Sequence, residues 1–180
     1  MEIQTERLCI RTLRPDDWPA LKAVFADFRR SPYSVYDAPL PAEDGAVQAL
    51  TERFAASRLF FAVFLKHSPA MIGYVGFHDD RGNYDLGYCF LSSCQGRGYA
   101  LEACEALLDA LRRLCGVKRF TAGTALKNAP SCRLLKRLGF TLWKTEALSF
   151  HKDGCGKDIV FTSGVFVKCC GEWHGEEHCP

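Results

Sequence analysis

Residues 95–100, with the sequence Gln-Gly-Arg-Gly-Tyr-Ala, are of the types and spacing that bind an anion. They follow a strand-like apolar run and precede a long amphipathic pattern that is typical of a helix. The first turn of a helix has backbone N–H groups without intrahelical partners, and the helix dipole makes that end positive. Gly96 and Gly98 carry no side chain that would hold a ligand away from these groups. The segment therefore predicts a phosphate site at a helix N-terminus.

The helix after this segment is predicted from its apolar spacing. The residues on its apolar face are Ala100, Ala103, Cys104, Leu107, Leu111 and Leu114. Acidic side chains lead and basic ones follow, which suits the helix dipole, and Gly116 stands where a left-handed cap is expected. Two familiar phosphate loops do not fit, because the chain here has neither the Gly-Lys-Ser/Thr ending of a nucleotide loop nor the G-x-G-x-x-G of a dinucleotide fold.

The pattern Gln95-x-x-Gly98-x-Ala100 is similar to the Q/R-x-x-G-x-G/A signature that binds the acetyl-CoA pyrophosphate in the GNAT superfamily of N-acetyltransferases. Three further segments match in the family's order, from about residue 5 to about residue 141. Residues 5–11 resemble the T-E-R-L-x-L-R opening of the RimJ/RimL-type branch, which acetylates ribosomal-protein N-termini and other amines. Residues 85–88 resemble that branch's fourth strand, and Asn128-x-x-Ser131 with the Leu-Gly-Phe at 138–140 resembles the element that flanks the CoA arm.

The resemblance implies a fold, a donor substrate and a set of binding residues. The fold is the α/β (α+β) GNAT fold, a mixed, mostly antiparallel twisted sheet of about seven strands with about four helices, in which the fourth and fifth strands splay apart. The donor is acetyl-CoA, and no metal is needed. Its pantetheine arm is expected on the backbone of Cys89, Phe90 and Leu91. Its pyrophosphate and flanking groups are expected at Gln95, Gly96, Arg97, Gly98, Tyr99, Ala100, Asn128 and Ser131.

Acetyl transfer to an amine needs a base and a stabilised leaving thiolate. Asp85 aligns with the strand carboxylate that serves as base in several GNAT enzymes, although a strand-edge acid is often only solvated. His78 is a second candidate for moving the proton, because imidazole titrates near neutrality, or else an ordinary loop histidine. Many GNAT enzymes place a tyrosine general acid where this chain has Leu135. Ser131 is therefore the candidate for stabilising the thiolate, or a helix residue that satisfies backbone groups.

Two functional hypotheses follow. In the first, the resemblance implies an enzyme that moves acetyl from acetyl-CoA to a primary amine by direct attack, the acceptor being a protein N-terminus or a small-molecule amine. In the second, which the missing tyrosine leaves open, the chain is a catalytically silent acetyl-CoA-binding regulatory module. The sequence leaves the acceptor open, because the variable loop at 29–41 contributes to its groove. The oligomeric state is left open as well, since the sequence is compatible with a monomer or a homodimer.

The composition agrees with one domain. The chain has 180 residues, of which 48% are hydrophobic, and its net charge of +2 comes without the basic cluster that a nucleic acid requires. The N-terminus is charged, and no apolar run reaches the roughly 18 residues of a membrane span, so we expect a cytoplasmic protein with no membrane partner. Its ten cysteines are then expected mostly as reduced, small apolar residues.

We divide the chain into an acetyltransferase domain at 1–168 and a tail at 169–180. The tail holds Cys169, Cys170, His174, His178 and Cys179, but its glycines and spacing argue against a zinc site. Periodicity predicts helices at 16–30, 41–57 and 130–138, the last with Asn128 near its cap, besides the long one before Gly116. It predicts strands at 7–13, 59–65, 71–77, 84–91, 119–123, 143–150 and 158–167.

Overall fold

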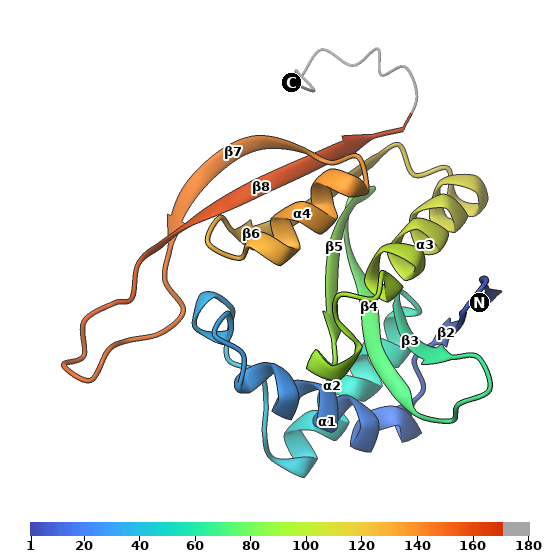
Figure 1. The fold of residues 1–180 in the computed structure, drawn as a ribbon, viewed down its shortest axis with the longest axis horizontal. Coiled ribbons are helices and arrows are strands. Elements are labelled where there is room, and N and C mark those ends of the chain that lie inside the picture. The colour runs from blue at the N-terminus through green and yellow to red at the C-terminus, as the bar shows by residue number, and fades with distance from the viewer. Residues whose placement is uncertain (171–180) are drawn as a thin grey trace.

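An eight-stranded mixed sheet forms the centre of the computed structural model, which describes residues 1–170 (Figure 1). The strands are β1 (Glu2–Gln4), β2 (Leu8–Thr12), β3 (Phe60–Leu65), β4 (Met71–Asp80), β5 (Asn83–Phe90), β6 (Arg119–Ala125), β7 (Thr141–Leu148) and β8 (Phe161–Cys169). The helices are α1 (Trp18–Arg29), α2 (Asp44–Ser57), α3 (Tyr99–Cys115) and α4 (Ala129–Arg137). The strand order is β1-β2-β3-β4-β5-β6-β8-β7, and every neighbouring pair is antiparallel except β5 with β6.

Two apolar clusters hold the helices to opposite faces of the sheet (Figure 1). On the face of α1 and α2, Phe25 lies edge-on to Tyr74, with ring centroids 6.0 Å apart, and Phe54 stacks on Phe60 at 3.7 Å. The face of α3 and α4 buries a larger set of aliphatic and aromatic side chains. Because both faces are covered, β3 reads as a continuous apolar run rather than an alternating one.

Glycines flank α3 at both ends, and the cap predicted at Gly116 is confirmed. Gly98 precedes the helix with φ +81°, and Gly116 follows it with φ +65°. Both values lie in the left-handed region, which is open to glycine and costly for most other residues. The chain therefore turns sharply into α3 at the segment for which the sequence predicts a phosphate site.

The sheet opens between β5 and β6, as the predicted fold requires. These two strands pair in parallel only where 83–85 of β5 meets 119–121 of β6. Beyond that point β5 continues to Phe90 and β6 to Ala125 without pairing to each other. Each strand still pairs on its other side, β5 with β4 and β6 with β8, so the opening does not disrupt the sheet. The result is a V-shaped gap that leaves one edge of β5 available to a ligand.

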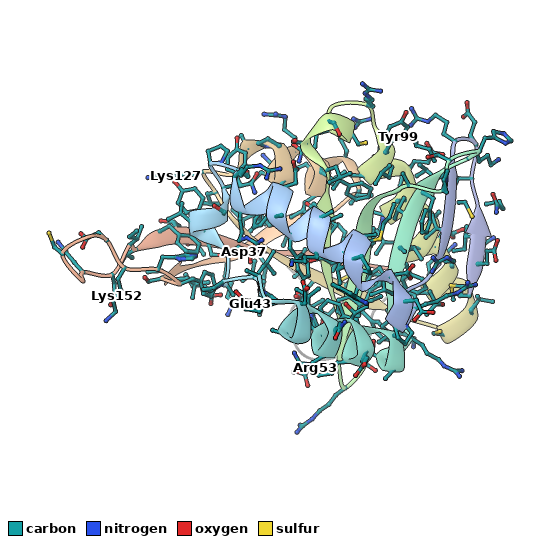
Figure 2. All side chains as sticks on the ribbon, turned by 90° about the horizontal axis from the view of Figure 1, so that it is seen from below. Asp37, Glu43, Arg53, Tyr99, Lys127 and Lys152 are labelled. Atoms are coloured by element: carbon teal, nitrogen blue, oxygen red, sulfur yellow. The ribbon has the colours of Figure 1, made fainter. Side chains whose placement is uncertain are left out.

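The structure corrects the predicted elements most clearly at the two ends of the chain. It has eight strands rather than about seven, because Glu2–Gln4 pairs with β2 despite a largely exposed, short sequence. The last two strands are Thr141–Leu148 and Phe161–Cys169, not 143–150 and 158–167. The segment between them is a loop, in which the Asp153 carboxylate accepts hydrogen bonds from the backbone of Cys155 and Lys157. Figure 2 shows this loop, with Lys152, projecting away from the rest of the molecule.

Two features are absent from residues 1–170. No group of three or more His, Cys, Asp or Glu side chains there is arranged to hold a metal ion. No helix in that range is long and apolar enough to cross a membrane. The tail residues His174, His178 and Cys179 lie outside the described residues.

The Thr-Glu-Arg opening of the chain is tied to the start of α3 through one carboxylate. Glu102, in the first turn of α3, accepts hydrogen bonds from the Thr5 hydroxyl, from the Arg7 backbone N–H at 2.9 Å and from Arg7 Nε at 2.7 Å. The Arg7 guanidinium also donates to the Arg97 carbonyl at 2.9 Å and lies over the Tyr99 ring. This brace fixes the glycine-containing turn against β2.

We expect Glu102→Gln to lower the melting temperature at neutral pH by roughly 2 to 4 °C in a domain of this size, since an amide cannot accept all three hydrogen bonds. Burial alone would raise the pKa of Glu102, but hydrogen bonds from Thr5 and Arg7 hold it below its ordinary 4.5. A lowered folded-state pKa stabilises the protein above the unfolded pKa, and this contribution disappears as the pH falls through the folded value. The difference between variant and wild type should therefore begin to shrink as the pH falls below 4.5.

Thermal unfolding measured from pH 7 to pH 3 tests this expectation. Glu105→Gln is the matched control, because Glu105 is exposed on the same helix. An undiminished difference for Glu102→Gln at pH 3 would show that the brace does not depend on the charge.

Candidate active site

The turn before α3 presents its backbone to open space. Gly96 has φ +73° and Gly98 has φ +81°. A Cβ placed on Gly96 would meet no atom within 4 Å, whereas one on Gly98 would lie 3.3 Å from the Arg7 guanidinium. The first N–H groups of α3 have no intrahelical partners, so the turn can accept an anion such as a phosphate.

Two further contacts hold the segment that joins β5 to this turn. The Asp27 carboxylate, on α1, accepts hydrogen bonds from the Ser92 backbone N–H at 2.7 Å and from the Ser92 hydroxyl at 3.0 Å. The Gln95 side-chain amide donates to the Phe90 carbonyl at 3.0 Å. Gln95 of the sequence signature therefore stabilises the turn by tying it to the end of β5.

A cavity of about 350 Å³ lies between the end of α1, the end of β5, the start of α3 and α4. It brings together most of the predicted binding residues. These are Cys89, Phe90, Gln95, Gly96, Gly98, Tyr99, Ala100, Asn128 and Ser131. Leu91, Arg97 and Asp85 are not among the residues that line it. Residues from four separate elements thus meet at the opening of the sheet.

The residues of β5 whose backbone groups face the gap are shifted by one from those that the resemblance implies. The Leu91 backbone N–H donates to the Ile72 carbonyl, on the β4 side, at 2.9 Å. Backbone hydrogen bonding to one neighbour alternates along an antiparallel strand, so Cys89 also bonds toward β4. The backbone groups of Tyr88 and Phe90 then face the gap. Of the three residues predicted from the family, Phe90 alone presents its backbone there, and Tyr88 was not predicted.

The first turn of α4 carries the polar groups on the opposite side of the cavity. The Asn128 side chain accepts a hydrogen bond from the Ser131 backbone N–H at 3.2 Å, which caps the helix as predicted. The Ser131 hydroxyl lies 2.8 Å from the Tyr88 hydroxyl. Leu135, at the position of the family's tyrosine, is only 1% exposed and packs in the core.

Two arginines that the sequence reasoning did not select also line the cavity. Arg133 and Arg137 lie on the exposed part of α4, four residues apart and therefore on one face of the helix. With Pro130 and Leu134, which also line the cavity, they follow the i, i+3, i+4, i+7 spacing of one helical face. That spacing, counted from the Asn128 cap, was the signal available in the sequence. Their charge suits a phosphorylated ligand.

Asp85 lies at the closed end of the gap rather than in the cavity. Its carboxylate accepts a hydrogen bond from the Thr121 hydroxyl at 2.7 Å, where β5 and β6 still pair. On the other side it is directly opposite His78 of β4. Directly opposite residues of an antiparallel pair share one face of the sheet, so Asp85 and His78 are neighbours on the face of α1 and α2.

Cys89 is among the residues that line the cavity, but its thiol is a poor nucleophile. Burial, with the carboxylates of Asp37 and Asp27 adding to it, raises the pKa of Cys89 to about 12. The thiol therefore stays protonated at neutral pH, and the thiolate is the reactive form. The site favours direct transfer between two bound substrates over a covalent intermediate on this cysteine.

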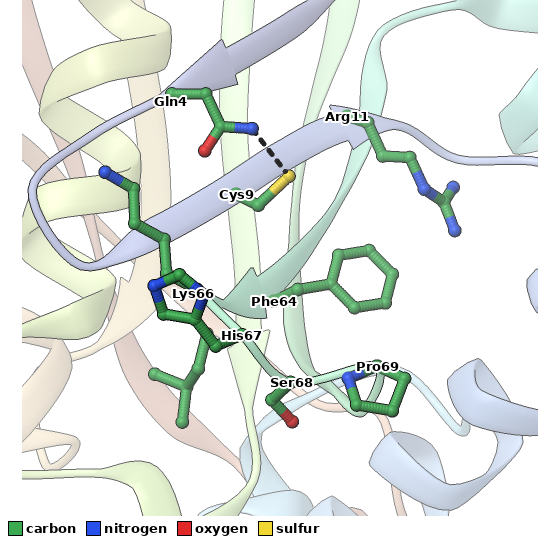
Figure 3. A pocket seen from close by; sticks show the side chains of 9 residues that line it. Gln4, Cys9, Arg11, Phe64, Lys66, His67, Ser68 and Pro69 are labelled. Atoms are coloured by element: carbon green, nitrogen blue, oxygen red, sulfur yellow. Dashed lines mark hydrogen bonds between the residues drawn. The ribbon is translucent and has the colours of Figure 1, made fainter.

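A second hollow, of about 710 Å³, lies at the β1–β3 side of the sheet and is shown in Figure 3. Its lining includes Gln4, whose amide donates to the Cys9 sulfur at 3.1 Å, and Arg11, which lies over the Phe64 ring. Although it is larger, it contains none of the predicted site residues and no helix N-terminus. We therefore place the candidate site in the smaller cavity at the sheet opening.

Comparison with known proteins identifies the family of the chain. Residues 7–141 match the family described as acetyltransferase (GNAT) domain. An uncharacterized N-acetyltransferase of Bacillus subtilis, YnaD, is 28% identical over 144 residues, which cover 77% of this chain and 82% of that protein.

Two solved structures share the fold. The ribosomal-protein-S5-alanine acetyltransferase of Vibrio fischeri has a TM-score of 0.78 at 17% identity and covers 97% of this chain and 100% of its own. RimL, a ribosomal L7/L12 α-N-protein acetyltransferase in complex with CoA, has a TM-score of 0.77 at 17% identity and covers 94% of this chain and 98% of its own.

The fold and the cavity thus define an acyltransferase of the kind that uses a CoA thioester. The chain belongs to the GNAT acetyltransferase family and is an acetyl-CoA-dependent N-acetyltransferase. The residues present fit the donor substrate: Gly96 leaves open space at the helix N-terminus for a pyrophosphate, and Arg133 and Arg137 add positive charge.

We expect acetyl-CoA at a hundred times its dissociation constant to stabilise the folded protein by about 2.7 kcal/mol, seen as a rise in melting temperature. Gly98→Glu should abolish this rise, because its carboxylate would lie against the pyrophosphate. Gly116→Glu is the matched control, since Gly116 caps the other end of α3 with a similar φ and nothing lies within 4 Å of its Cβ position. Equal responses of the two variants to acetyl-CoA would place the donor elsewhere.

Proposed function

We propose that the chain transfers the acetyl group of acetyl-CoA directly to a primary amine, which is a protein N-terminus or a small-molecule amine. The observation that carries this proposal is the cavity at the sheet opening. It joins an anion-binding helix N-terminus to the hydroxyl pair of Ser131 and Tyr88. The helix N-terminus suits the charged pyrophosphate end of acetyl-CoA, and the hydroxyl pair suits its reacting thioester end.

The roles proposed for the binding residues follow from this geometry. The N–H groups from Gly96 to Ala100 bind the pyrophosphate, and the backbone of Tyr88 and Phe90 binds the pantetheine arm along the open edge of β5. Ser131 donates a hydrogen bond to the sulfur as negative charge develops there. Asp27, Gln95 and the Arg7–Glu102 pair hold these groups in position without touching the donor.

We propose that Asp85 removes the proton from the attacking amine, through water where the distance requires it. Asp85 is held by Thr121, and His78 beside it gives the proton a second acceptor. This pair lies outside the cavity lining, on the face of α1 and α2. The base would therefore reach the amine from the face of the sheet opposite the one that carries the Tyr88 side chain.

A protein N-terminus is the first acceptor that we propose. Residues 5–11 resemble the opening of the RimJ/RimL-type branch, and two proteins of the same fold are described as ribosomal-protein acetyltransferases. A small-molecule amine remains the second candidate. The cavity also has Phe28, Ser31 and Tyr33 in its lining, so the loop after α1 is where an acceptor would be selected.

An acceptor panel tests the proposed function. Release of CoA from acetyl-CoA is measured with short peptides of differing N-terminal residues, with the same peptides blocked at the N-terminus, and with small primary amines. We expect turnover that depends on a free amino group and acetylated product identified by mass. Tight acetyl-CoA binding without turnover on any amine would instead support the silent binding module.

We expect Asp85→Asn to lower turnover by about 100- to 10,000-fold, the usual cost of removing a general base. Acetyl-CoA affinity should change little, because Asp85 does not line the cavity. The loss should shrink as the pH rises, since more of the amine is then unprotonated. Turnover against pH is measured beside Asp80→Asn, an exposed carboxylate at the end of β4. If Asp85→Asn stays within about twofold of wild type at every pH, the proton leaves by solvent or by His78.

A further inference from the structure

The Tyr88 backbone is proposed above to bind the donor, but its hydroxyl, which lies beside Ser131 in the cavity, has no separate role in the reaction so far. It comes from the open edge of β5, and Ser131 comes from the first turn of α4, 43 residues later. Their hydroxyl oxygens are 2.8 Å apart, and both residues line the cavity. This contact exists because α4 packs across the gap that β5 and β6 leave between them.

The hydrogen-bonding capacity of the pair is what makes it informative. Each hydroxyl has one proton to donate and can accept others. Only one of the two can donate across the 2.8 Å contact at a time. The other neighbour of the Tyr88 hydroxyl is the Ser131 carbonyl at 3.5 Å, which is too far for a strong bond. When Ser131 donates to a different acceptor, Tyr88 is placed to donate to Ser131.

We propose that Tyr88 is a positioning residue that turns the Ser131 proton toward the sulfur of acetyl-CoA. As charge develops on sulfur, Ser131 donates to it and Tyr88 donates to the Ser131 oxygen. The inference rests on the proposed function and adds a residue to it. A thioester sulfur is a weak acceptor and a thiolate is a strong one, so the arrangement stabilises the transition state more than the bound substrate.

The step conserves atoms and electrons with the groups already named. The amine nitrogen forms a bond to the acetyl carbon, the carbon–sulfur bond breaks, and sulfur keeps the electron pair. The amine proton goes to the base or to solvent. Ser131 and Tyr88 keep their own protons and only reorient them. The thiolate takes its proton from solvent when CoA leaves.

The surroundings of Tyr88 favour this role. Burial raises the pKa of the Tyr88 phenol, and the hydrogen bond with Ser131 offsets this only in part, so the phenol stays protonated as a donor. Leu135, where many relatives carry a tyrosine, is 1% exposed and offers no hydroxyl. Tyr88 therefore provides the cavity with a phenol from a strand instead of a helix.

The kinetic test compares Tyr88→Phe, Ser131→Ala and the double variant. Tyr84→Phe is the matched control, since Tyr84 lies on the same face of β5 but does not line the cavity. We expect kcat to fall about threefold to tenfold for Tyr88→Phe, the worth of one net hydrogen bond. It should fall about a hundredfold for Ser131→Ala, as for loss of one transition-state donor. The double variant should match Ser131→Ala, and the dissociation constant of acetyl-CoA should not change.

A second measurement needs no turnover. The thiol of CoA bound to the protein is titrated by the ultraviolet absorbance of its thiolate. We expect a pKa below that of free CoA in the wild type. Tyr88→Phe should raise it by about half a pH unit to one pH unit, which corresponds to the same hydrogen bond. The same substitution in the Ser131→Ala background should have no effect.

Three outcomes would overturn the inference. The first is a Tyr88→Phe variant with wild-type kcat and an unchanged thiol titration. The second is an equal loss from Tyr88→Phe with and without Ser131, which would make the two residues independent. The third is a loss of acetyl-CoA affinity or melting temperature that accounts for the loss of rate, which would leave Tyr88 a packing residue. A wild type that acetylates no amine would contradict the proposed function, while the thiol titration would still test the pair.

Discussion

The carboxylate of Glu102 is the group on which the geometry of the site depends. It accepts hydrogen bonds from Thr5 and Arg7 at the start of the chain and lies one turn inside α3. Arg7 in turn reaches the Arg97 carbonyl in the turn before that helix. A turn with two left-handed glycines has many alternative conformations, and this brace selects the one that presents its N–H groups to the cavity. The Thr-Glu-Arg motif at the start of the chain thus has a structural role, because it contacts Glu102, about a hundred residues later in the sequence.

The splay of β5 and β6 is the second constraint. An interior strand normally bonds on both edges, and an unpaired buried edge is costly. Here the gap costs little because it faces a cavity, while β4 and β8 keep the other edges paired. The open edge of β5 can then bind a polar ligand as an added strand would bind. The same gap brings α4 close enough for Ser131 to meet Tyr88.

The chemistry of the cavity follows from burial as much as from residue type. Cys89 is at the right place to be a nucleophile, but burial keeps its thiol protonated. Tyr88 is kept protonated in the same way, and for a hydrogen-bond donor that is an advantage. Leu135 turns into the core and leaves hydroxyl chemistry to Ser131 and its partner. These environments support the proposed direct transfer of the acetyl group, in which Ser131 donates to the leaving sulfur.

The sequence by itself determined the helix cap at Gly116, the Asn128 cap and the order of the elements, because these depend on backbone conformation and periodicity within a few residues. It did not determine the strand Glu2–Gln4, which is polar and exists only by pairing with β2. Nor did it show that Asp85 lies outside the cavity, or that Arg133 and Tyr88 lie in it. Those facts depend on strand register and on where β5 and β6 part. Register and splay are set by packing between distant segments, so only the tertiary structure decided which side chains meet.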